Sequence, residues 1–194
     1  MYKLRTIVLE DEDDNRNWLV KKLAQFQEID LVGEAATLDD AFLLIANTQP
    51  DAAFMDIQLI GGSAFSLLNR LQENGISIPL IVITTGYPEY AMNALNDYRR
   101  YVVQYLVKPF VEDWPVKLRK SVDALVSNSL RETPYPVSRL PQSVFISNRG
   151  NLLRLDYDKI AYLEAAGGGE TFIVTDTDIH RVDMTLAKFI ELLP

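Results

Sequence analysis

The stretch TIVLEDEDDN, residues 6–15, passes from an apolar run directly into a cluster of acidic residues. Ile7 to Leu9 have the character of a buried strand, and the next five residues, Glu10 to Asp14, are all acidic. Two like charges ~4 Å apart repel by about 1 kcal/mol in water and by several times that near a protein surface. A fold accommodates this crowding on a solvated turn, beside a cation or at a helix N-terminus. A solvated turn is the simplest interpretation unless other residues converge on the same place.

The composition fits one domain of good size, or one domain and a smaller module. The chain has 194 residues, of which 48% are hydrophobic, so a sizeable core is expected. Its net charge of -8 argues against a nucleic-acid surface spread over the whole molecule. The absence of cysteine excludes disulfides, thiolate catalysis and Cys-ligated zinc. No signal peptide or apolar run of ~20 residues is visible. We therefore expect a cytoplasmic protein with no membrane partner.

Short apolar runs alternate with amphipathic helical patterns in the first two thirds of the chain. The runs that predict strands are residues 6–9, 31–35, 52–55, 80–84 and 102–107. The patterns that predict helices surround Leu19 to Phe26 and Leu38 to Ile45, and cover residues 63–73, 87–96 and 111–126. Five βα repeats of this kind indicate an α/β fold with a doubly wound, five-stranded parallel sheet and right-handed crossovers.

The pattern changes after residue 126. Residues 127–143 contain three prolines among polar residues and are typical of a linker. From residue 144 to residue 194 the period becomes that of strands, which predicts a smaller β-rich module. We expect a hairpin across Asn148 to Asn151, a second hairpin turn at Gly167 to Gly169, and a closing amphipathic helix from Leu186 to Leu193. Such a module would form only a marginal core by itself.

Polar side chains follow several of the predicted strands at their carboxyl ends. In open parallel sheets, ligands bind beyond this edge. The first strand is followed by Glu10 and Asp11, the third by Asp56, and the fifth by Lys108, while the fourth ends in Thr84. Each residue alone is weak evidence for a site, because strand ends are often polar. Three carboxylates, a hydroxyl and an ammonium at one edge together specify a site.

These residues lie in stretches with a recognisable order and spacing. The stretches are VLEDE at the first strand, PDAAFMDIQL around Asp56, VITTG at Thr84, and YLVKPF from Tyr105 to Phe110. Together they resemble the receiver domain of two-component response regulators, and the resemblance covers residues 1–126, beginning at about residue 3. It implies a flavodoxin-like fold with strand order 2-1-3-4-5.

The resemblance also implies roles for the site residues. Asp56 would accept a phosphoryl group from a sensor histidine kinase as a carboxylate nucleophile. Mg²⁺ would be held by Glu10, Asp11, Asp56 and the backbone carbonyl of Gln58, since this cation prefers hard oxygen ligands. Lys108 would pair with a phosphoryl oxygen. The remaining acids, Glu12 to Asp14, fit the N-terminus of the first helix, where they complement the helix dipole.

A switch is implied by the same resemblance. Thr84 would move towards the phosphoryl group, and Tyr105 would turn inwards into the space that it leaves. The alternative for Tyr105 is an ordinary strand residue with its hydroxyl in water. The Lys108–Pro109 peptide bond is expected to be cis.

Two positions depart from the family pattern in the loop after Asp56. Ile60 stands where the family often has proline, and Ala64 stands where it usually has glycine. Gly61 and Gly62 permit positive φ angles and could compensate. These two departures affect the expected shape of the loop and the expected lifetime of the phosphoryl group on Asp56, but not the expected chemistry.

The second module resembles the first part of a LytTR-type DNA-binding domain, from Ile160 to Glu164 through the strand pair and the closing helix. In that family a further segment rich in Arg, His and Ser follows this helix. From residue 131 onward there are 7 basic and 9 acidic residues, a poor electrostatic match for DNA. Either the chain is truncated or the module no longer binds DNA. His180 has no ligand partners in the sequence and fits an ordinary strand position.

Three functions remain open from the sequence. The first is a response regulator that switches a DNA-binding output. The resemblance implies that its receiver dimerises through the face of the fourth and fifth helices and the last strand, with residues 98–101 and Trp114 as candidates for that surface. The second, a Mg²⁺ phosphohydrolase, is disfavoured because Gln58 stands where such enzymes place their acid and base. The third is a receiver-fold interaction module that no longer uses phosphorylation. We expect no enzymatic turnover beyond a single phosphoryl transfer and slow self-dephosphorylation.

Overall fold

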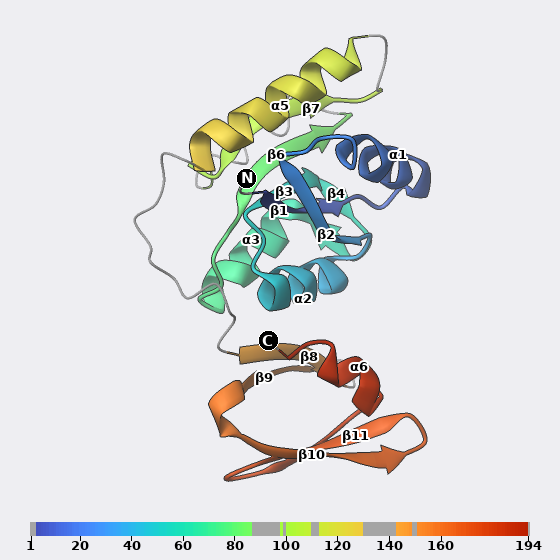
Figure 1. Cartoon of the computed structure of the whole chain (residues 1–194), viewed down its shortest axis with the longest axis vertical. Coiled ribbons are helices and arrows are strands. Elements are labelled where there is room, and N and C mark those ends of the chain that lie inside the picture. The colour runs from blue at the N-terminus through green and yellow to red at the C-terminus, as the bar shows by residue number, and fades with distance from the viewer. Residues whose placement is uncertain are drawn as a thin grey trace. The chain divides into compact units, whose positions relative to one another are not determined.

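The computed structural model of the chain describes residues 3–86, 98, 100–109, 113–129, 143–148 and 151–193. The chain forms two compact units, Met1–Val137 and Ser138–Pro194. Figure 1 shows the elements of both units. The helix predicted at 87–96 and most of the predicted linker, residues 130–142, lie outside the described residues. Each unit is described by itself below.

The first unit is built on a five-stranded parallel sheet. Its strands are β1 (Leu4–Leu9), β2 (Ile29–Ala35), β3 (Ala52–Asp56), β6 (Leu80–Thr85) and β7 (Val102–Val107). They pair in the order β2-β1-β3-β6-β7, and every pair is parallel. Counted along the chain, these five strands have the order 2-1-3-4-5, which confirms the predicted fold class. All five residues of the central strand β3 are buried, because helices cover the sheet on both faces.

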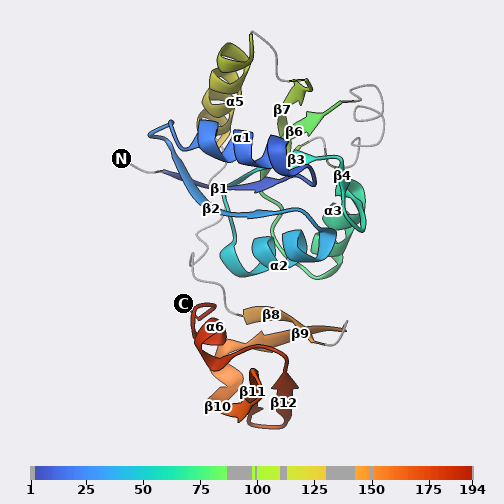
Figure 2. The ribbon, with the colours of Figure 1, turned by 90° about the vertical axis from the view of Figure 1, so that its right-hand side faces the viewer.

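Helices of the described residues cover both faces of this sheet, as Figure 2 shows. On one side lie α1 (Asp13–Leu23) and α5 (Trp114–Ser129), and on the other lie α2 (Leu38–Thr48) and α3 (Ala64–Glu73). The core beneath α1 and α5 joins helix and strand side chains such as Leu19, Val82 and Leu118. Thr37 caps α2 and Ser63 caps α3, each accepting a hydrogen bond from the backbone N–H three residues later.

A small hairpin follows β3 at the upper edge of the sheet. It consists of β4 (Gln58–Leu59) and β5 (Gly62–Ser63), which pair antiparallel. Gly61 between them has φ +93°, a left-handed conformation that favours glycine. The hairpin leads directly into α3.

The second unit is β-rich, as predicted. The strands β8 (Ser143–Asn148) and β9 (Asn151–Asp156) form one antiparallel pair. A 3₁₀ turn, η2 (Tyr157–Lys159), leads to an antiparallel sheet of β10 (Ile160–Gly167), β11 (Glu170–Thr175) and β12 (Ile179–Val182). The chain continues into a short helix, α6 (Leu186–Ile190). The buried core of this unit comprises Val144, Ile146, Leu155, Ile173, Val182 and Phe189.

Both hairpins predicted for this unit are confirmed. Asn148 pairs with Asn151, and all three residues from Gly167 to Gly169 have positive φ angles between β10 and β11. His180 lies in β12 opposite Ile173, which is an ordinary strand position. The helix is shorter than predicted, since it ends at Ile190 instead of reaching Leu193. Among the described residues, no helix has the length and apolarity that a membrane crossing requires.

Candidate functional site

The carboxyl ends of the central strands meet at one level. Leu9 pairs with Met55, so Glu10 and Asp56 extend from neighbouring strands at the same height, and Asp56 pairs with Thr84. A cavity of about 770 Å³ opens above this edge. It is lined by Asp11, Glu12, Asn15, Asp56, Ile57, Gln58, Thr85, Gly86, Lys108 and Pro109. The predicted convergence of polar residues at the sheet edge is therefore present.

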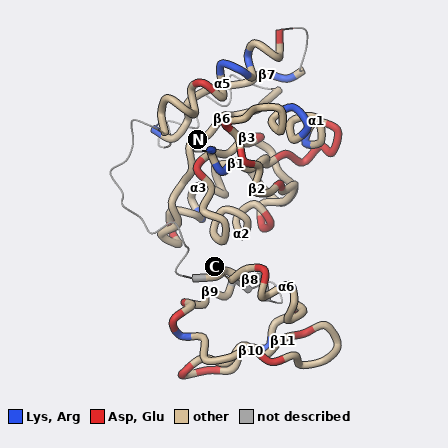
Figure 3. Tube along the Cα trace, in the orientation of Figure 1, with Lys and Arg blue, Asp and Glu red and all other residues tan. Residues whose placement is uncertain are grey.

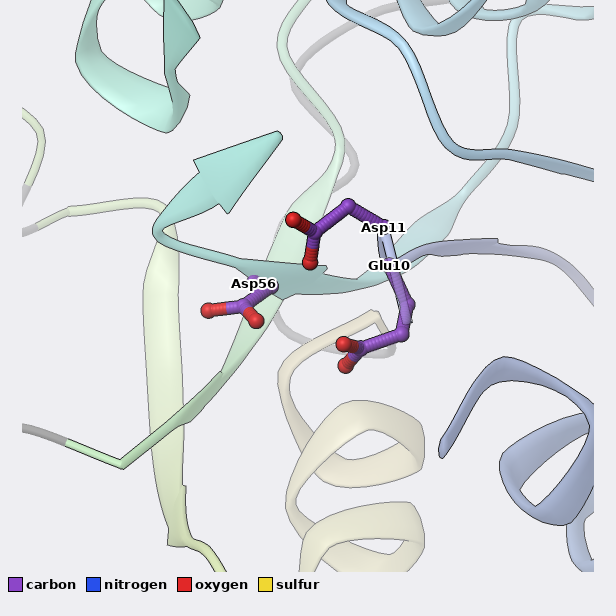
Figure 4. A group of neighbouring side chains, drawn as sticks. All are labelled: Glu10, Asp11 and Asp56. Carbon is purple, nitrogen blue, oxygen red and sulfur yellow. The ribbon is translucent and has the colours of Figure 1, made fainter. Parts of the chain in front are cut away.

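Three carboxylates gather beside the cavity. One oxygen from each of Glu10, Asp11 and Asp56 lies within 4.8 Å of the others, and Figure 4 shows the three side chains turned towards a common region. Glu10 is fully buried, Asp56 is 8% exposed, and Asp11 is half-buried. Acidic residues also mark the β1–α1 junction in Figure 3. Of the acids that follow the first strand, Glu10 and Asp11 belong to this cluster, whereas Asp13 and Asp14 are exposed in the first turn of α1.

Lys108 links two of these carboxylates. Its Nζ donates a hydrogen bond to Asp56 Oδ2 at 2.6 Å and another to Glu10 Oε1 at 2.7 Å. The other oxygen of Asp56, Oδ1, accepts from the backbone N–H of Ile57 at 2.6 Å and of Gln58 at 3.4 Å. The carboxylate of Asp56 is therefore held in one orientation while it still borders the cavity. The Lys108–Pro109 bond is cis, as predicted.

The pKa values of this group reflect its burial. The pKa of Glu10 is raised to about 7, chiefly by burial and also by the charge of Asp56, although the hydrogen bond from Lys108 acts in the opposite direction. Burial lowers the pKa of Lys108, but its hydrogen bonds to Asp56 and Glu10 outweigh this effect, so the pKa lies above its ordinary value. A cation near Glu10 would keep this carboxyl group ionised around neutral pH.

The donor set fits a hard divalent cation. All three side chains offer carboxylate oxygens, which Mg²⁺ prefers over nitrogen or sulfur. Glu10 Oε2 is buried and has no hydrogen-bond partner. A buried carboxylate oxygen without a partner is costly, so a cation or a water bound to that cation is the chemically natural neighbour.

The sequence predicted Thr84 as the hydroxyl of this site, but the structure places the next residue, Thr85, at the cavity. Thr84 is fully buried, does not line the cavity, and its Oγ1 has no hydrogen-bond partner. Thr85 lines the cavity instead, and its carbonyl accepts a hydrogen bond from the Lys108 N–H at 2.8 Å. Because successive side chains of a strand point to opposite faces, a shift of one residue changes which hydroxyl reaches the site. The strand β6 runs one residue further than predicted and ends at Thr85.

Other predicted residues take the following places. Gln58 lines the cavity and is exposed. Tyr105 is half-buried in β7 opposite Ile83 and does not line the cavity. Two of the proposed interface residues are not on the surface: Tyr98 is 6% exposed and donates to Asn69, and Trp114 is 1% exposed. Their aromatic character is used in packing, and the prediction that they form an interface is wrong.

Sequence reasoning missed several residues of the cavity wall. Glu12 was assigned only to the start of α1, but it lines the cavity together with Asn15, whose side-chain N–H donates to Glu12 Oε2 at 2.8 Å. Asn15 is one helical turn after Asp11, and this spacing is the signal that could have identified it. Gly86, the residue after Thr85, also lines the cavity.

Comparison with known proteins places most of the first unit in a class of signal-receiver domains. Residues 6–121 match the sequence profile of the Response regulator receiver domain. The chain therefore belongs to the response regulator receiver family.

Two curated relatives extend the comparison. An uncharacterized response regulatory protein of Yersinia pestis is 30% identical over 168 residues, which cover 86% of this chain and 67% of that protein. The sensory transduction protein LytT of Bacillus cereus is 32% identical over 117 residues, which cover 60% of this chain and 46% of LytT. The chain thus spans two thirds or less of these relatives.

Solved structures show the same fold. The response regulatory domain of protein mrkE from Klebsiella pneumoniae superposes with a TM-score of 0.56 at 18% identity, over 66% of this chain and 100% of that domain. The response regulator domain of Thermotoga maritima CheB gives a TM-score of 0.51 at 18% identity, over 66% of this chain and 95% of that domain.

Proposed function

We propose that this chain is the response regulator of a two-component system, in which Asp56 accepts a phosphoryl group from a sensor histidine kinase. The observation that carries this proposal is the position of Lys108 Nζ, 2.6 Å from Asp56 and 2.7 Å from Glu10, at the wall of a cavity that Asp11 also lines. A carboxylate nucleophile, further carboxylates and a lysine in one cavity are the groups that phosphoryl transfer to an aspartate needs.

The residues of the chain would act in the transfer as follows. Asp56 Oδ2 attacks the phosphorus of the donor phosphohistidine, the P–N bond breaks, and the bonding pair returns to the histidine ring. An acyl phosphate forms on Asp56. The backbone N–H groups of Ile57 and Gln58 hold Oδ1 so that Oδ2 faces the cavity. Lys108 then exchanges its contact with the carboxylate for one with a phosphoryl oxygen.

Mg²⁺ would be held by Glu10, Asp11, Asp56 and the backbone carbonyl of Gln58. When bound, it neutralises charge between the nucleophile and the incoming phosphoryl oxygens. Glu10 Oε2, which is buried without a hydrogen-bond partner, supports this assignment.

The switch is assigned to Thr85 and Tyr105. Thr85, in place of Thr84, would hydrogen-bond the phosphoryl group, since it is the hydroxyl that lines the cavity. Tyr105 would respond from β7 by turning inwards. We further propose that the chain is no multiple-turnover enzyme, because the neutral side chain of Gln58 offers no proton acceptor for hydrolysis.

The proposed output is a LytTR-type transcriptional regulator. The alignment with the Yersinia relative covers 168 residues and so must extend beyond the first unit, which ends at Val137. A LytT protein of Enterococcus faecalis aligns over 98% of this chain at 22% identity. DNA and a second copy of the chain are the proposed partners of the active form. Figure 3 shows that the second unit carries acidic as well as basic residues.

Phosphoryl transfer can be tested with acetyl phosphate and Mg²⁺ as donor and cofactor. Intact-protein mass spectrometry should find one added phosphoryl group on the wild type and none on Asp56→Asn. Asp14→Asn is the matched control, because Asp14 is exposed on α1 and does not line the cavity. Continued labelling of Asp56→Asn would refute the assignment. Unchanged amide spectra near Thr85 and Tyr105 with beryllofluoride and Mg²⁺ would favour an interaction module without phosphorylation.

The output can be tested by selection from a random duplex library with the phosphorylated protein. Enrichment of a sequence motif that depends on acetyl phosphate supports a DNA-binding output. Recovery of no motif, while Asp56 is labelled, would contradict it for this chain.

A further inference from the structure

We propose that Ile60 joins the loop after Asp56 to the N-terminus of α2, so that occupation of the phosphorylation site is transmitted to α2. This inference rests on the proposed function of Asp56 as phosphoacceptor. It concerns a connection made by the backbone of Ile60. From the sequence alone, this residue is notable only because the family often has proline at its position.

The connection consists of two hydrogen bonds in opposite directions. The Ile60 N–H donates to the Ala36 carbonyl at 3.1 Å, and the Leu38 N–H donates to the Ile60 carbonyl at 2.9 Å. Ile60 and Thr37 consequently form a short parallel β-bridge. A residue bonded through both its donor and its acceptor cannot shift without moving or breaking both contacts.

The segment between Asp56 and Ile60 is short and internally bonded. Asp56 Oδ1 accepts from the N–H groups of Ile57 and Gln58, and the Ile57 carbonyl accepts from the N–H of Ala64 at 2.8 Å. When a phosphoryl group and a cation occupy the Asp56 carboxylate, these two N–H groups must find a new geometry. The β4–β5 hairpin carries that adjustment to Ile60.

The same hairpin also packs closely against α2. A Cβ atom added at Gly62 would lie 2.6 Å from Leu38 Cδ1, so the backbone of the hairpin touches the first residue of the helix. Leu38 therefore meets this loop through its backbone, by the hydrogen bond to Ile60, and through its side chain, which lies against Gly62.

The N-terminus of α2 is in turn connected to α3. Thr37 caps the helix by accepting from the Asp40 N–H at 3.1 Å. Asp39 forms an ion pair with Arg70 of α3 at 2.5 Å, and the guanidinium of Arg70 lies 4.3 Å from the ring centroid of Phe42. A displacement of Leu38 therefore reaches the exposed side of both α2 and α3.

The role of the Ile60 backbone N–H can be tested separately from that of the Ile60 side chain. The side chain is 57% exposed, so its replacement disturbs little packing. Proline removes the N–H that bonds to Ala36, and Leu59 before it lies in a strand, the conformation that a residue preceding proline favours. Ile60→Ala keeps the N–H and serves as the matched control.

The experiment is amide hydrogen exchange of the full chain by NMR, with and without beryllofluoride and Mg²⁺. In the wild type and in Ile60→Ala, the analogue should slow exchange at Leu38 and Asp40 by about fivefold, the factor to which one net hydrogen bond corresponds. In Ile60→Pro the slowing at these two amides should be lost, while Gly86 and Lys108 still respond.

Each other outcome overturns the inference. If the wild type responds at Gly86 and Lys108 but Leu38 and Asp40 are unchanged, the connection to α2 does not exist, and this result stands even if the proline variant fails to fold. If Ile60→Pro and Ile60→Ala both keep the response at α2, the N–H of Ile60 does not carry it. If no amide responds in the wild type, the proposed function of Asp56 fails, and the inference fails with it.

Discussion

Replacing Lys108 with methionine removes an ammonium group and keeps a side chain of similar length, and it should strengthen Mg²⁺ binding. Lys108 Nζ lies 2.6 and 2.7 Å from oxygens of Asp56 and Glu10. A Mg²⁺ ion that shared either of these oxygens at ~2.1 Å would lie within about 4.8 Å of Nζ. A unit charge and a divalent ion at that distance repel by about 2 kcal/mol in water, which corresponds to a ~30-fold change in affinity. If the ammonium moves away, it loses two hydrogen bonds instead, and this cost also opposes binding.

The affinity can be measured by isothermal titration calorimetry of the unphosphorylated protein with MgCl₂. Lys117→Met is the matched control, because Lys117 is an exposed residue of α5 that pairs with Asp113 and does not line the cavity. Its affinity for Mg²⁺ should stay within ~2-fold of the wild type, since screening weakens exposed charges. Without Mg²⁺, Lys108→Met should also lower Tm, because two neighbouring carboxylates lose their shared partner, and Mg²⁺ should restore it. Equal or weaker Mg²⁺ binding by Lys108→Met would refute the assignment of the cation to these carboxylates.

Further predictions concern residues whose burial is known. Thr84→Val should raise the free energy of unfolding by up to ~1 kcal/mol, because it removes a buried hydroxyl with no hydrogen-bond partner; destabilisation would show that a partner exists. Thr85→Ala should leave stability within ~1 kcal/mol but abolish the spectral response of Tyr105 to beryllofluoride, and an unchanged response would exclude Thr85 from the switch. Trp114→Ala should cost about 3–5 kcal/mol in urea unfolding, since Trp114 is 1% exposed and edge-on to Trp18 at 4.3 Å; a loss below ~1 kcal/mol would contradict this packing.

Most of the sheet could be predicted from the sequence because its central strands β3 and β6 are almost purely apolar and buried on both faces. The strand at 102–107 was predicted with its observed bounds, and β3 was one residue longer than predicted because it includes Asp56 itself. Helix α5 runs to Ser129, beyond the predicted end at Val126. Periodicity identifies elements with a buried face, whereas their last turn is set by local hydrogen bonds that the pattern does not encode.

The charged residues of the site could be predicted from the sequence, whereas the threonine that supplies its hydroxyl could not. Asp56 is the last residue of its strand, and Glu10 and Lys108 directly follow theirs, so their order along the chain places them at the sheet edge. Two adjacent threonines, Thr84 and Thr85, offer the same chemistry, and the sequence does not show where β6 ends. The structure separates them, since only Thr85 lines the cavity. Both threonines are buried, so contact with the cavity, and not burial, is what distinguishes these two identical groups.

The residues at the two positions that depart from the family pattern both take part in backbone hydrogen bonds of the loop after Asp56. At position 60 isoleucine adds a backbone donor that bonds to Ala36 at 3.1 Å, which a proline lacks. At position 64 alanine is the first residue of α3, fully buried, and its N–H bonds to the Ile57 carbonyl. Neither residue has a positive φ angle, so neither position requires glycine. Backbone hydrogen bonds therefore hold this loop at both positions, and the bond from Ile60 is the one on which the proposed link between Asp56 and α2 depends.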